Sequence, residues 1–411
     1  MIRFLNLSDA RGLITRKTVR LEEAERVVAP ILADVRTRGD AALLEYARKF
    51  DGFTGAAVRM PMEGTLAPQM LRAVEIAAAN IRECARRQLP VESSVSFEDG
   101  RRIGQIVRPL DSMGAYIPAG RYPLPSTVMM TVIPAQVAGV ATTCLACPNP
   151  SAEILGIAKW LGVTHLFRMG GAQAIAALAY GTETVPKVDR IVGPGNIYVA
   201  AAKKLIAGEV GIDFVAGPTE IVIIASEGDP RWLAADMLAQ AEHDVDASSI
   251  LLTTSRALAE AVAVEIERQL ETLSTNEVAR ASIAGNGAIV MVDSLDEAVE
   301  FSNQLAPEHL SLHHSELLAG IKHAGSVFIG PFSPEAAGDY ATGPNHVLPT
   351  SGVARIRGGL SAADFVKVIS VQELSRAGLE KLTPAIATLA RAEGLEAHAR
   401  SVEVRGEVRN A

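Results

Sequence analysis

The spacing of hydrophobic and polar positions changes several times along the chain and divides it into regions. Residues 21–50 and 68–88 place apolar side chains three and four positions apart, which is the spacing of amphipathic helices. Arg38-Gly39-Asp40 interrupts the first of these regions, so we predict a pair of helices there. Residues 95–110 alternate between apolar and polar positions around Asp99-Gly100, and this pattern predicts a β-hairpin.

From residue 113 onward, short apolar strands alternate with helices in two series. The first series has the strands MGAYIP, TTCLACP, HLFRMGG, DRIVGP and DFVAGP, and its helices begin near Ser126, Ser151, Gly171 and Asn196. The second series has the strands EIVIIAS, SSILLTTS, AIVMVDS, HLSLHH and GSVFIGP, with helices near 230–244, 256–272, 295–304 and 315–323. Repeated βα units predict parallel sheets covered by helices.

We therefore predict an α/β fold built from two related, incomplete Rossmann-like βα domains with parallel sheets, plus helical N-terminal and C-terminal segments. Residues 331–360 between the second series and the C-terminal helix are irregular and rich in Gly and Pro, as functional loops often are. The expected regions are an N-terminal arm (1–20), a helical region and hairpin packing with the second α/β domain (21–112), the first α/β domain (113–218), the second α/β domain (219–355) and a helical tail (356–411).

Residues 122–152 contain no charged side chain and are long enough to span a bilayer, but Pro134 and Gln136 interrupt them. We predict instead a buried helix from Ser126 to Gly139, with Ser126 as its N-cap, followed by a buried strand from Ala141 to Cys147. The N-terminus lacks the pattern of a secretory signal and the chain has few cysteines, so we expect a cytoplasmic protein.

The composition of the chain mainly excludes classes of protein. Hydrophobic residues make up 48% of the chain and charged residues 21%, which excludes wholesale disorder. The formal net charge of −8 argues against binding to nucleic acid, whose phosphates must be neutralised by basic side chains. We therefore expect neither a nucleic-acid partner nor a membrane partner.

Two glycine-containing turns are candidates for binding a phosphate. Gly170-Gly171-Ala172-Gln173 and Gly193-Pro194-Gly195-Asn196 each follow a predicted strand and open a helix, whose first amides can hold an anion. The pattern G-x-G-x-x-G is absent, and each turn is also explained as a tight turn that needs glycine. Their place at the carboxyl ends of strands favours a ligand site.

Histidines next to carboxylates are the other candidates. His243 follows Gln240 by three positions on a predicted helix, so both side chains would share a face. His243, Asp339 and His398 could bind zinc, although they come from distant segments and scattered histidines more often have no metal. Glu308-His309 at the start of a strand could act as a general base, or be a structural strand entry.

Cys144 and Cys147 form a CxxC within a predicted strand, where positions three apart face opposite sides of the sheet. A redox CxxC lies instead at the start of a helix. We predict two buried structural cysteines.

A series of sequence blocks then becomes informative as a set: GAYIPAGRYPLPST, RMGGAQAIAALAYGTETVPKVDRIVGPGN, AGPTEI, MLAQAEHD, APEHL, AGDYATGPNHVLPT and AEGLEAH, in this order. The set resembles the histidinol dehydrogenase family from about residue 10 to residue 405. The resemblance implies an oxidoreductase of histidine biosynthesis that converts L-histidinol through L-histidinal to L-histidine, using NAD twice and a zinc ion in each subunit.

The resemblance also implies roles for individual residues. It assigns zinc to Gln240, His243, Asp339 and His398, acid/base chemistry to Glu308 and His309, and NAD contacts to Tyr116, Gln173 and Asn196. The implied substrate contacts are Thr219, Gln240, His243, His309, Asp339, Glu393 and His398. Family members commonly have serine where Thr219 stands, so the hydroxyl is kept and a methyl group is added. His346 belongs to a block that lies near the family's site.

The family is a homodimer with exchanged segments, which implies that the tail carrying His398 reaches the partner's site. One alternative is a related zinc- and NAD-dependent dehydrogenase of another small alcohol, such as a hydroxylated sulfonate. Glu393 in its AEGLEAH block favours histidinol. A second alternative is a two-domain solute-binding protein, which would not need Glu308-His309 beside a zinc set.

Overall fold

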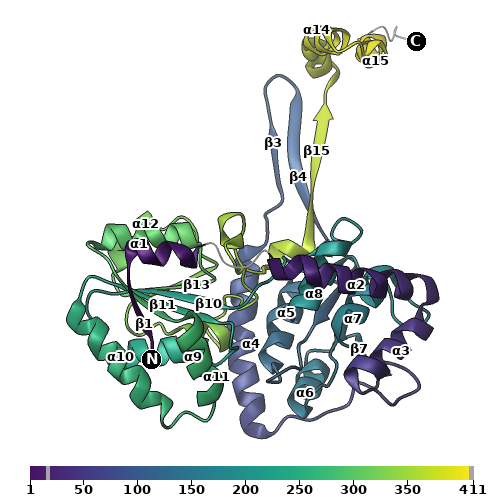
Figure 1. The fold of residues 1–411 in the computed structure, drawn as a ribbon. Helices are drawn as coiled ribbons and strands as arrows, with labels where there is room; N and C mark the ends of the chain where they lie inside the picture. The colour runs from purple at the N-terminus through teal and green to yellow at the C-terminus, as the bar shows by residue number, and fades with distance from the viewer. Residues whose placement is uncertain (15–18, 407–411) are drawn as a thin grey trace. The chain divides into compact units, whose positions relative to one another are not determined.

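The computed structural model describes residues 1–14 and 19–406, and these residues divide into two compact units. The large unit comprises Met1–Gln88 and Leu110–Phe365, and the small unit comprises Leu89–Pro109 and Val366–Ala411. In Figure 1, helices surround one sheet of the large unit in blue and teal and a second sheet in green.

The first sheet of the large unit has, over the described residues, the strand order β2-β7-β6-β5-β8-β9. Its strands are β2 (Arg59–Met60), β5 (Ser112–Tyr116), β6 (Thr142–Ala146), β7 (His165–Phe167), β8 (Arg190–Val192) and β9 (Gly211–Ile212). All pairs are parallel except β2 with β7. The chain adds β6 and β7 on one side of β5 and β8 and β9 on the other, so the strand order reverses between β5 and β8.

Helices cover both faces of the first sheet. One face packs against α2 (Val19–Arg38), α3 (Asp40–Asp51), α7 (Gly171–Tyr180) and α8 (Ile197–Ile206), and the other against α4 (Pro68–Gln88), α5 (Pro125–Ala138) and α6 (Ala152–Trp160). The predicted helices over 21–50 and 68–88 are confirmed. Their predicted packing with the second α/β domain is wrong, because the apolar face of α2 fits the alanine-rich α7 and α8, and α4 packs on α5.

Two further details of this half differ from the sequence-based predictions. Helix α5 begins at Pro125 with Leu124 as its N-cap, so Ser126 is a buried residue of the helix and not its cap. Proline suits the first helical position because its missing N–H would have no partner there. The predicted strand DFVAGP is also wrong, because Asp213 follows β9 and its side chain accepts a hydrogen bond from the Gly193 N–H at 2.8 Å.

The second sheet has, again over the described residues, the order β1-β12-β11-β10-β13-β14, with every pair parallel. Its strands are β1 (Arg3–Asn6), β10 (Glu220–Ile224), β11 (Ser248–Thr253), β12 (Ala288–Met291), β13 (His309–Leu312) and β14 (Ser326–Ile329). Residues 3–6 are therefore an edge strand and not part of a free arm, whereas residues 15–18 of the predicted arm lie outside the described residues.

The short helix α1 (Leu7–Ala10) and the helices α9 (Pro230–Ala241), α10 (Arg256–Leu270), α11 (Asn276–Asn286) and α12 (Leu295–Leu305) accompany the second sheet. The segment 315–323, predicted as a helix, contains the 3₁₀-helix η2 (Ser315–Gly320), and α11 lies outside every predicted helix. The irregular segment contains α13 (Glu335–Tyr340) and the 3₁₀-helix η3 (Val353–Arg355), and η4 (Ala362–Phe365) ends the large unit.

The small unit contains an antiparallel sheet of order β15-β4-β3, formed by β3 (Ser93–Ser96), β4 (Arg101–Pro109) and β15 (Val366–Leu374). The predicted hairpin is confirmed, with Gly100 at a φ of 89° in its turn. Helices α14 (Arg376–Ala392) and α15 (Glu396–Gly406) follow. The helical tail predicted for 356–411 is thus wrong at β15, whose nine residues pair along the whole of β4.

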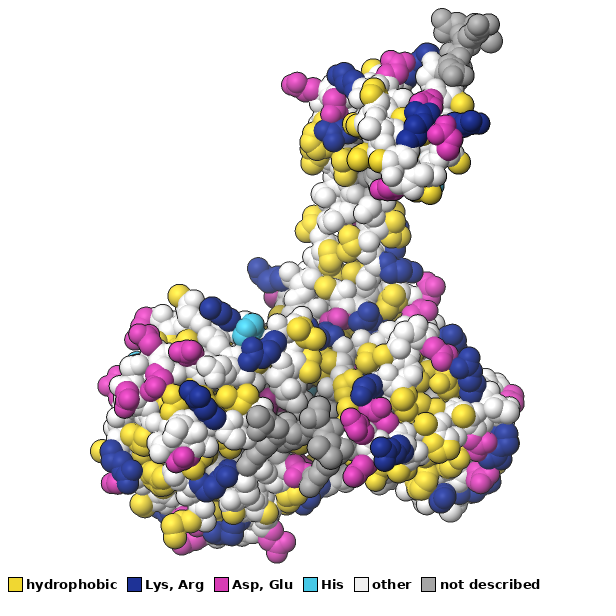
Figure 2. Space-filling model, turned by 45° about the horizontal axis from the view of Figure 1, so that its top comes forward, with side chains coloured by type: hydrophobic (Ala, Val, Ile, Leu, Met, Phe, Trp, Pro, Cys, Tyr) yellow, Lys and Arg dark blue, Asp and Glu magenta, His cyan; other side chains and the backbone are white. Residues whose placement is uncertain are grey.

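Charges of both signs are interspersed on the face of the large unit drawn in Figure 2, which gives no single basic field for nucleic acid. Among the helices built from residues 1–14 and 19–406, none is both long and apolar enough to cross a membrane.

Candidate functional site

The amino edge of the second sheet, where its strands begin, gathers several predicted residues. Glu308 immediately precedes β13 and His309 opens it, while Thr219 immediately precedes β10, the parallel neighbour of β13. The Thr219 hydroxyl donates a hydrogen bond to Glu308 Oε2 at 2.5 Å, and the Glu220 N–H donates to the same oxygen at 3.0 Å. Burial raises the pKa of Glu308 despite these bonds, because a carboxylate loses its hydration there.

His309 lies at the centre of this group and is only 3% exposed. Its Nδ1 lies 3.7 Å from Glu308 Oε2 and 3.8 Å from Glu335 Oε1, and its Nε2 lies 3.6 Å from Asp339 Oδ1. Burial alone would lower the pKa of His309, but the surrounding carboxylates outweigh it and raise the pKa to about 10. Among the described residues, no group accepts or donates a hydrogen bond at His309 Nε2.

Gln240 and His243 reach the same edge from the end of α9. The helix follows β10 and runs back across the sheet, so its last turn returns to the edge where β10 begins. Gln240 is fully buried and its amide nitrogen donates to Thr219 Oγ1 at 2.6 Å. His243 lies just past the helix, which ends at Ala241, so the prediction that both residues share a helical face is wrong. His243 Nε2 is nevertheless 3.9 Å from Asp339 Oδ2.

Helix α13 adds Asp339 and a carboxylate that the sequence did not reveal, Glu335. The two residues are four positions apart and share a face of the helix. Glu335 is 2% exposed, and burial raises its pKa to about 8. Burial opposes ionisation of Asp339 as well, but the nearby His309 imidazole outweighs it and lowers the pKa of Asp339. The spacing of Glu335 and Asp339 was a usable signal, but their segment looked irregular.

This group suits a divalent cation. One ligand atom each of His243, Glu335 and Asp339 lies within 4.8 Å of the others. With the Gln240 amide nitrogen bonded to Thr219, the amide oxygen faces only hydrogen-bond acceptors. A cation would resolve this conflict, and so would turning the amide over, which lets it donate to Glu335 Oε1 at 2.9 Å. Imidazole nitrogen and carboxylate oxygen are ligands that zinc accepts.

Two of the predicted residues belong to the small unit. Glu393 is the C-cap of α14, and His398 lies in the first turn of α15, where its N–H donates to the Leu395 carbonyl at 3.0 Å. Their predicted roles in substrate and zinc binding stay predictions.

The predicted NAD residues lie at the carboxyl edge of the first sheet, where its strands end. Tyr116 ends β5, and its hydroxyl accepts a hydrogen bond from the Gly171 N–H at 3.2 Å. Asn196 is the N-cap of α8, and its side chain accepts from the amides of Tyr198 and Val199 at 3.0 and 3.1 Å. Both lie where the strand order reverses between β5 and β8, a place where open α/β sheets bind ligands.

Gln173, in the first turn of α7, is held by a residue that the sequence did not reveal. Its amide donates to Asp51 Oδ2 at 3.1 Å, and the same oxygen accepts from the Gly170 N–H at 3.0 Å. Burial raises the pKa of Asp51 in spite of these bonds. Asp51 ends α3, far from Gly170 in the sequence, so no local pattern could have connected them.

A short polar bridge joins the two edges within the large unit. The His346 ring bonds through Nδ1 to the Asp339 carbonyl at 2.9 Å and through Nε2 to the Thr127 hydroxyl, near the start of α5, at 3.2 Å. The neighbouring Asn345 donates to the Met130 carbonyl at 2.6 Å. Because α5 starts at the carboxyl edge of the first sheet, this edge faces the amino edge of the second.

The CxxC cysteines are structural, as predicted. Cys144 belongs to the core on one face of the first sheet and Cys147 to the core on the other. Burial raises the pKa of each thiol to about 12, which keeps it protonated at neutral pH.

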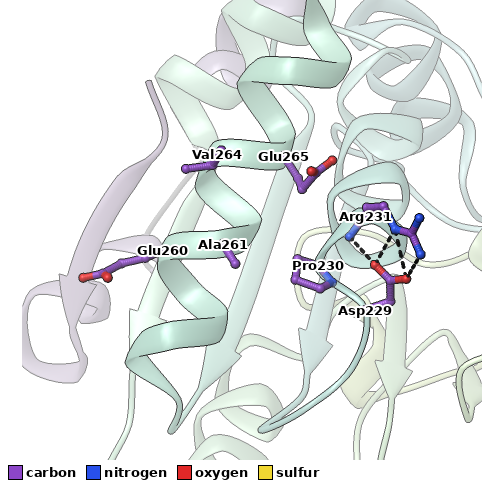
Figure 3. A pocket seen from close by; sticks show the side chains of 7 residues that line it. All are labelled: Asp229, Pro230, Arg231, Glu260, Ala261, Val264 and Glu265. Atoms are coloured by element: carbon purple, nitrogen blue, oxygen red, sulfur yellow. Dashed lines mark hydrogen bonds and ion pairs between the residues drawn. The ribbon is translucent and has the colours of Figure 1, made fainter.

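A surface pocket elsewhere contains none of the predicted residues. Figure 3 shows it between the start of α9 and α10, lined by Asp229, Pro230, Arg231, Glu260, Ala261, Val264 and Glu265. Each charged residue of the lining already has a partner: Arg231 pairs with Asp229 at 3.0 Å, Glu260 with Arg256 at 2.7 Å and Glu265 with Arg268 at 2.8 Å.

Comparisons with known proteins agree with this arrangement. The histidinol dehydrogenase family model matches residues 14–406. The chain is 48% identical to "Histidinol dehydrogenase" of Geobacter sulfurreducens, covering 98% of this chain and 100% of that protein. It is 49% identical to "Histidinol dehydrogenase" of Geobacillus kaustophilus, covering 96% and 97%.

The structure of histidinol dehydrogenase from Elizabethkingia anophelis superposes with a TM-score of 0.94 at 37% identity, covering 98% of each chain. A family match of this extent, together with full-length relatives, settles the family and confirms the α/β fold. The chain belongs to the histidinol dehydrogenase family.

Proposed function

We propose that this oxidoreductase converts L-histidinol through L-histidinal to L-histidine, with NAD as hydride acceptor and zinc as resident metal. The observation that carries the proposal is the buried Glu308–His309 pair, which lies beside Gln240, His243 and Asp339. His346 joins this edge to the other sheet. Zinc held by Gln240, His243, Asp339 and His398 would supply the positive charge that fixes the substrate's imidazole and amine.

His309 is the proposed base of both oxidations. It takes the hydroxyl proton as the carbinol carbon gives its hydride to the first NAD, which leaves the aldehyde. The imidazole must be neutral before it can accept a proton, and three carboxylates raise the pKa of His309 to about 10. A divalent cation among them would offset their charge and free the imidazole for this role.

Glu308 is the proposed base for the hydration step. Its carboxylate takes a proton from water as the water oxygen bonds to the aldehyde carbon, which gives the hydrate. The hydrate then gives its hydride to a second NAD while His309 takes the hydroxyl proton, leaving the carboxylic acid. The bonds from Thr219 and Glu220 fix one oxygen of Glu308, and the raised pKa makes it a stronger base.

NAD is proposed to bind at the carboxyl edge of the first sheet, against Tyr116, Gln173 and Asn196. Support comes from the reversal of strand order at this edge and from the start of α8, a helix long enough for a dipole to favour phosphate. The two sheet edges face each other, which suits hydride transfer from a substrate on one to a cofactor on the other.

We infer a homodimer with shared sites, in which the small unit serves the partner. Apolar side chains on its sheet are largely exposed, among them Ile103, Val368 and Ile369 at 43–49%, and Figure 2 shows hydrophobic side chains along these strands. An exposed apolar surface of this kind favours a protein partner.

Mixing two inactive variants tests the shared site. A His398→Ala chain combined with a Gln240→Ala chain should regain part of the activity, because some mixed dimers then contain one site with both residues intact. If mixing restores nothing, although both chains still form mixed dimers, the shared site is contradicted.

The cysteines also support the proposed cytoplasmic location. Cys84, Cys144 and Cys147 are all free thiols, which suits a reducing compartment. Fusion of the chain to a fluorescent protein in its native host would check this directly.

The function is tested by following NADH absorbance after adding L-histidinol to the zinc-loaded protein. We expect NADH to form in a ratio of two per histidinol consumed. A signal with a hydroxylated sulfonate but none with histidinol would favour the related dehydrogenase, and no signal with any small alcohol would contradict the dehydrogenase itself.

A further inference from the structure

A buried ion pair lies behind the Gly193-Asn196 turn of the large unit. Lys203, on α8, pairs through Nζ with Asp213, which follows β9. Their side chains are 3% and 0% exposed. Neither residue is among the predicted site residues, and the proposed chemistry does not use them.

The pair holds one residue, Gly193, through both of its backbone polar groups. The Gly193 N–H donates to Asp213 Oδ2 at 2.8 Å, and the Gly193 carbonyl accepts from Lys203 Nζ at 3.1 Å. The second Asp213 oxygen accepts from the Phe214 N–H at 2.7 Å. Every oxygen of this buried carboxylate therefore has a partner, and the Gly193 backbone is fixed at both its donor and its acceptor.

Gly193 is also pressed against the end of β5. Its φ of 107° lies in a region that L side chains rarely adopt, and a Cβ there would collide with the Tyr116 carbonyl oxygen. The ion pair thus sets the distance between the turn that carries Asn196 and the strand that carries Tyr116. Both of these residues belong to the proposed NAD site.

Stability is a weak explanation for this pair. Two buried charges lose their hydration, and replacing such a pair by uncharged side chains is often neutral or stabilising. What uncharged side chains cannot provide here is a cationic donor to the carbonyl and an anionic acceptor for the N–H of one residue. The arrangement therefore favours a role in geometry.

We propose that Lys203 and Asp213 are positioning residues for the dinucleotide: they fix the Gly193 backbone so that Asn196 and Tyr116 meet NAD together. This inference rests on the proposed NAD site. Loss of the ion pair should therefore weaken the binding of NAD. The binding of zinc and histidinol, on the other sheet, should be unaffected.

The test compares Lys203→Met with the double variant Lys203→Met/Asp213→Asn in the zinc-loaded protein. Lys203→Met leaves Asp213 as an unpaired buried charge, so we expect a large fall in Tm. The double variant removes both charges and should recover most of that Tm. It still lacks the donor to the Gly193 carbonyl, so we expect Kd for NAD to stay roughly tenfold weaker, the weight of one charge-assisted hydrogen bond.

Titration calorimetry gives Kd for NAD, and steady-state kinetics gives KM for each substrate. KM for L-histidinol should stay within about twofold of the wild-type value, because the proposal confines the roughly tenfold loss of affinity to NAD. Ile206→Ala is the matched control, because this fully buried residue is the last of α8, at the opposite end from Asn196, and should lower Tm without weakening NAD binding.

Wild-type NAD affinity in the double variant would overturn the proposal, and so would an equal loss of NAD and histidinol affinity. Failure of the proposed function looks different, because the wild-type protein itself would then neither bind NAD nor reduce it with histidinol.

Discussion

The two sheets of the large unit have the same topology but present candidate residues at opposite edges. In each, the βα series begins at a central strand, β5 or β10, and adds strands first on one side and then on the other. An earlier segment of the chain supplies one edge strand of each sheet, the antiparallel β2 or the parallel β1. The first sheet places Tyr116 and Asn196 where strands end, whereas the second places Glu308 and His309 where a strand begins. A repeated fold therefore does not decide where a site lies.

The chemistry of the two edges differs as much as their position. The first edge offers neutral amides and hydroxyls, with the Asp51 carboxylate already engaged by Gly170 and Gln173. The second edge packs Glu308, Glu335 and Asp339 around His309. The first edge thus suits a polar dinucleotide, and the second suits a cation and proton transfer.

Removing zinc should have the largest effect, and this effect should be confined to the second edge. Chelation is expected to abolish histidinol-dependent NADH formation, because the carboxylates around His309 are then uncompensated. NAD should still bind to the first edge with unchanged Kd, which titration calorimetry can measure. Full activity in a demonstrably metal-free protein would contradict both the zinc role and the contrast between the edges.

Glu308→Gln should separate the two chemical steps at the second edge. Loss of the base for hydration is expected to slow oxidation of histidinal by roughly 10²–10⁴-fold while sparing oxidation of histidinol more. Stopped-flow measurements with each substrate give the two rates. Glu316→Gln, an exposed carboxylate near His314, is the control. An equal loss in both half-reactions would rule out this division of labour.

Asn196→Ala should have a moderate effect, confined to the first edge. It removes a helix cap worth about 1 kcal/mol and a proposed NAD contact, so KM for NAD should rise several-fold while KM for histidinol stays unchanged. Ser255→Ala removes the matching cap of α10 in the other half. This control should lower Tm by a similar amount and leave NAD binding intact. If Ser255→Ala weakens NAD binding as much as Asn196→Ala does, the effect of Asn196→Ala arises from lost stability.

The sequence predicted the strands of both series because buried parallel strands give continuous apolar runs that need no partner to be recognised. It failed where pairing across the chain decides the structure, as in β15, which forms along β4, and β1, which adds to β12. Each of these strands depends on a partner that is distant in the sequence.

The candidate site shows the same limit. Residue types and their neighbours singled out His243, Glu308 and His309, but only the family resemblance identified Gln240 as a ligand. Glu335 was missed because its segment looked irregular and because its burial depends on the packing of α13 against α9.

The second edge also predicts a pH dependence of stability in the metal-free protein. The pKa of His309 is raised to about 10 and that of Glu335 to about 8. Both groups therefore bind protons more tightly in the folded than in the unfolded chain, so folding stability must fall as pH rises. For His309 the contribution is complete below its unfolded pKa of about 6.5 and disappears as pH rises through about 10.

Urea unfolding of the chelated protein between pH 6 and pH 8 measures this slope below the range in which the buried Cys144 and Cys147 thiols contribute. Glu335→Gln should flatten it, because the variant removes one raised pKa and lowers the other by taking a negative charge away from His309. Glu260→Gln, an exposed carboxylate paired with Arg256, should leave the slope unchanged. A slope that survives Glu335→Gln would place the titrating groups outside the second edge, and the electrostatic contrast between the two sheets would then lose its main support.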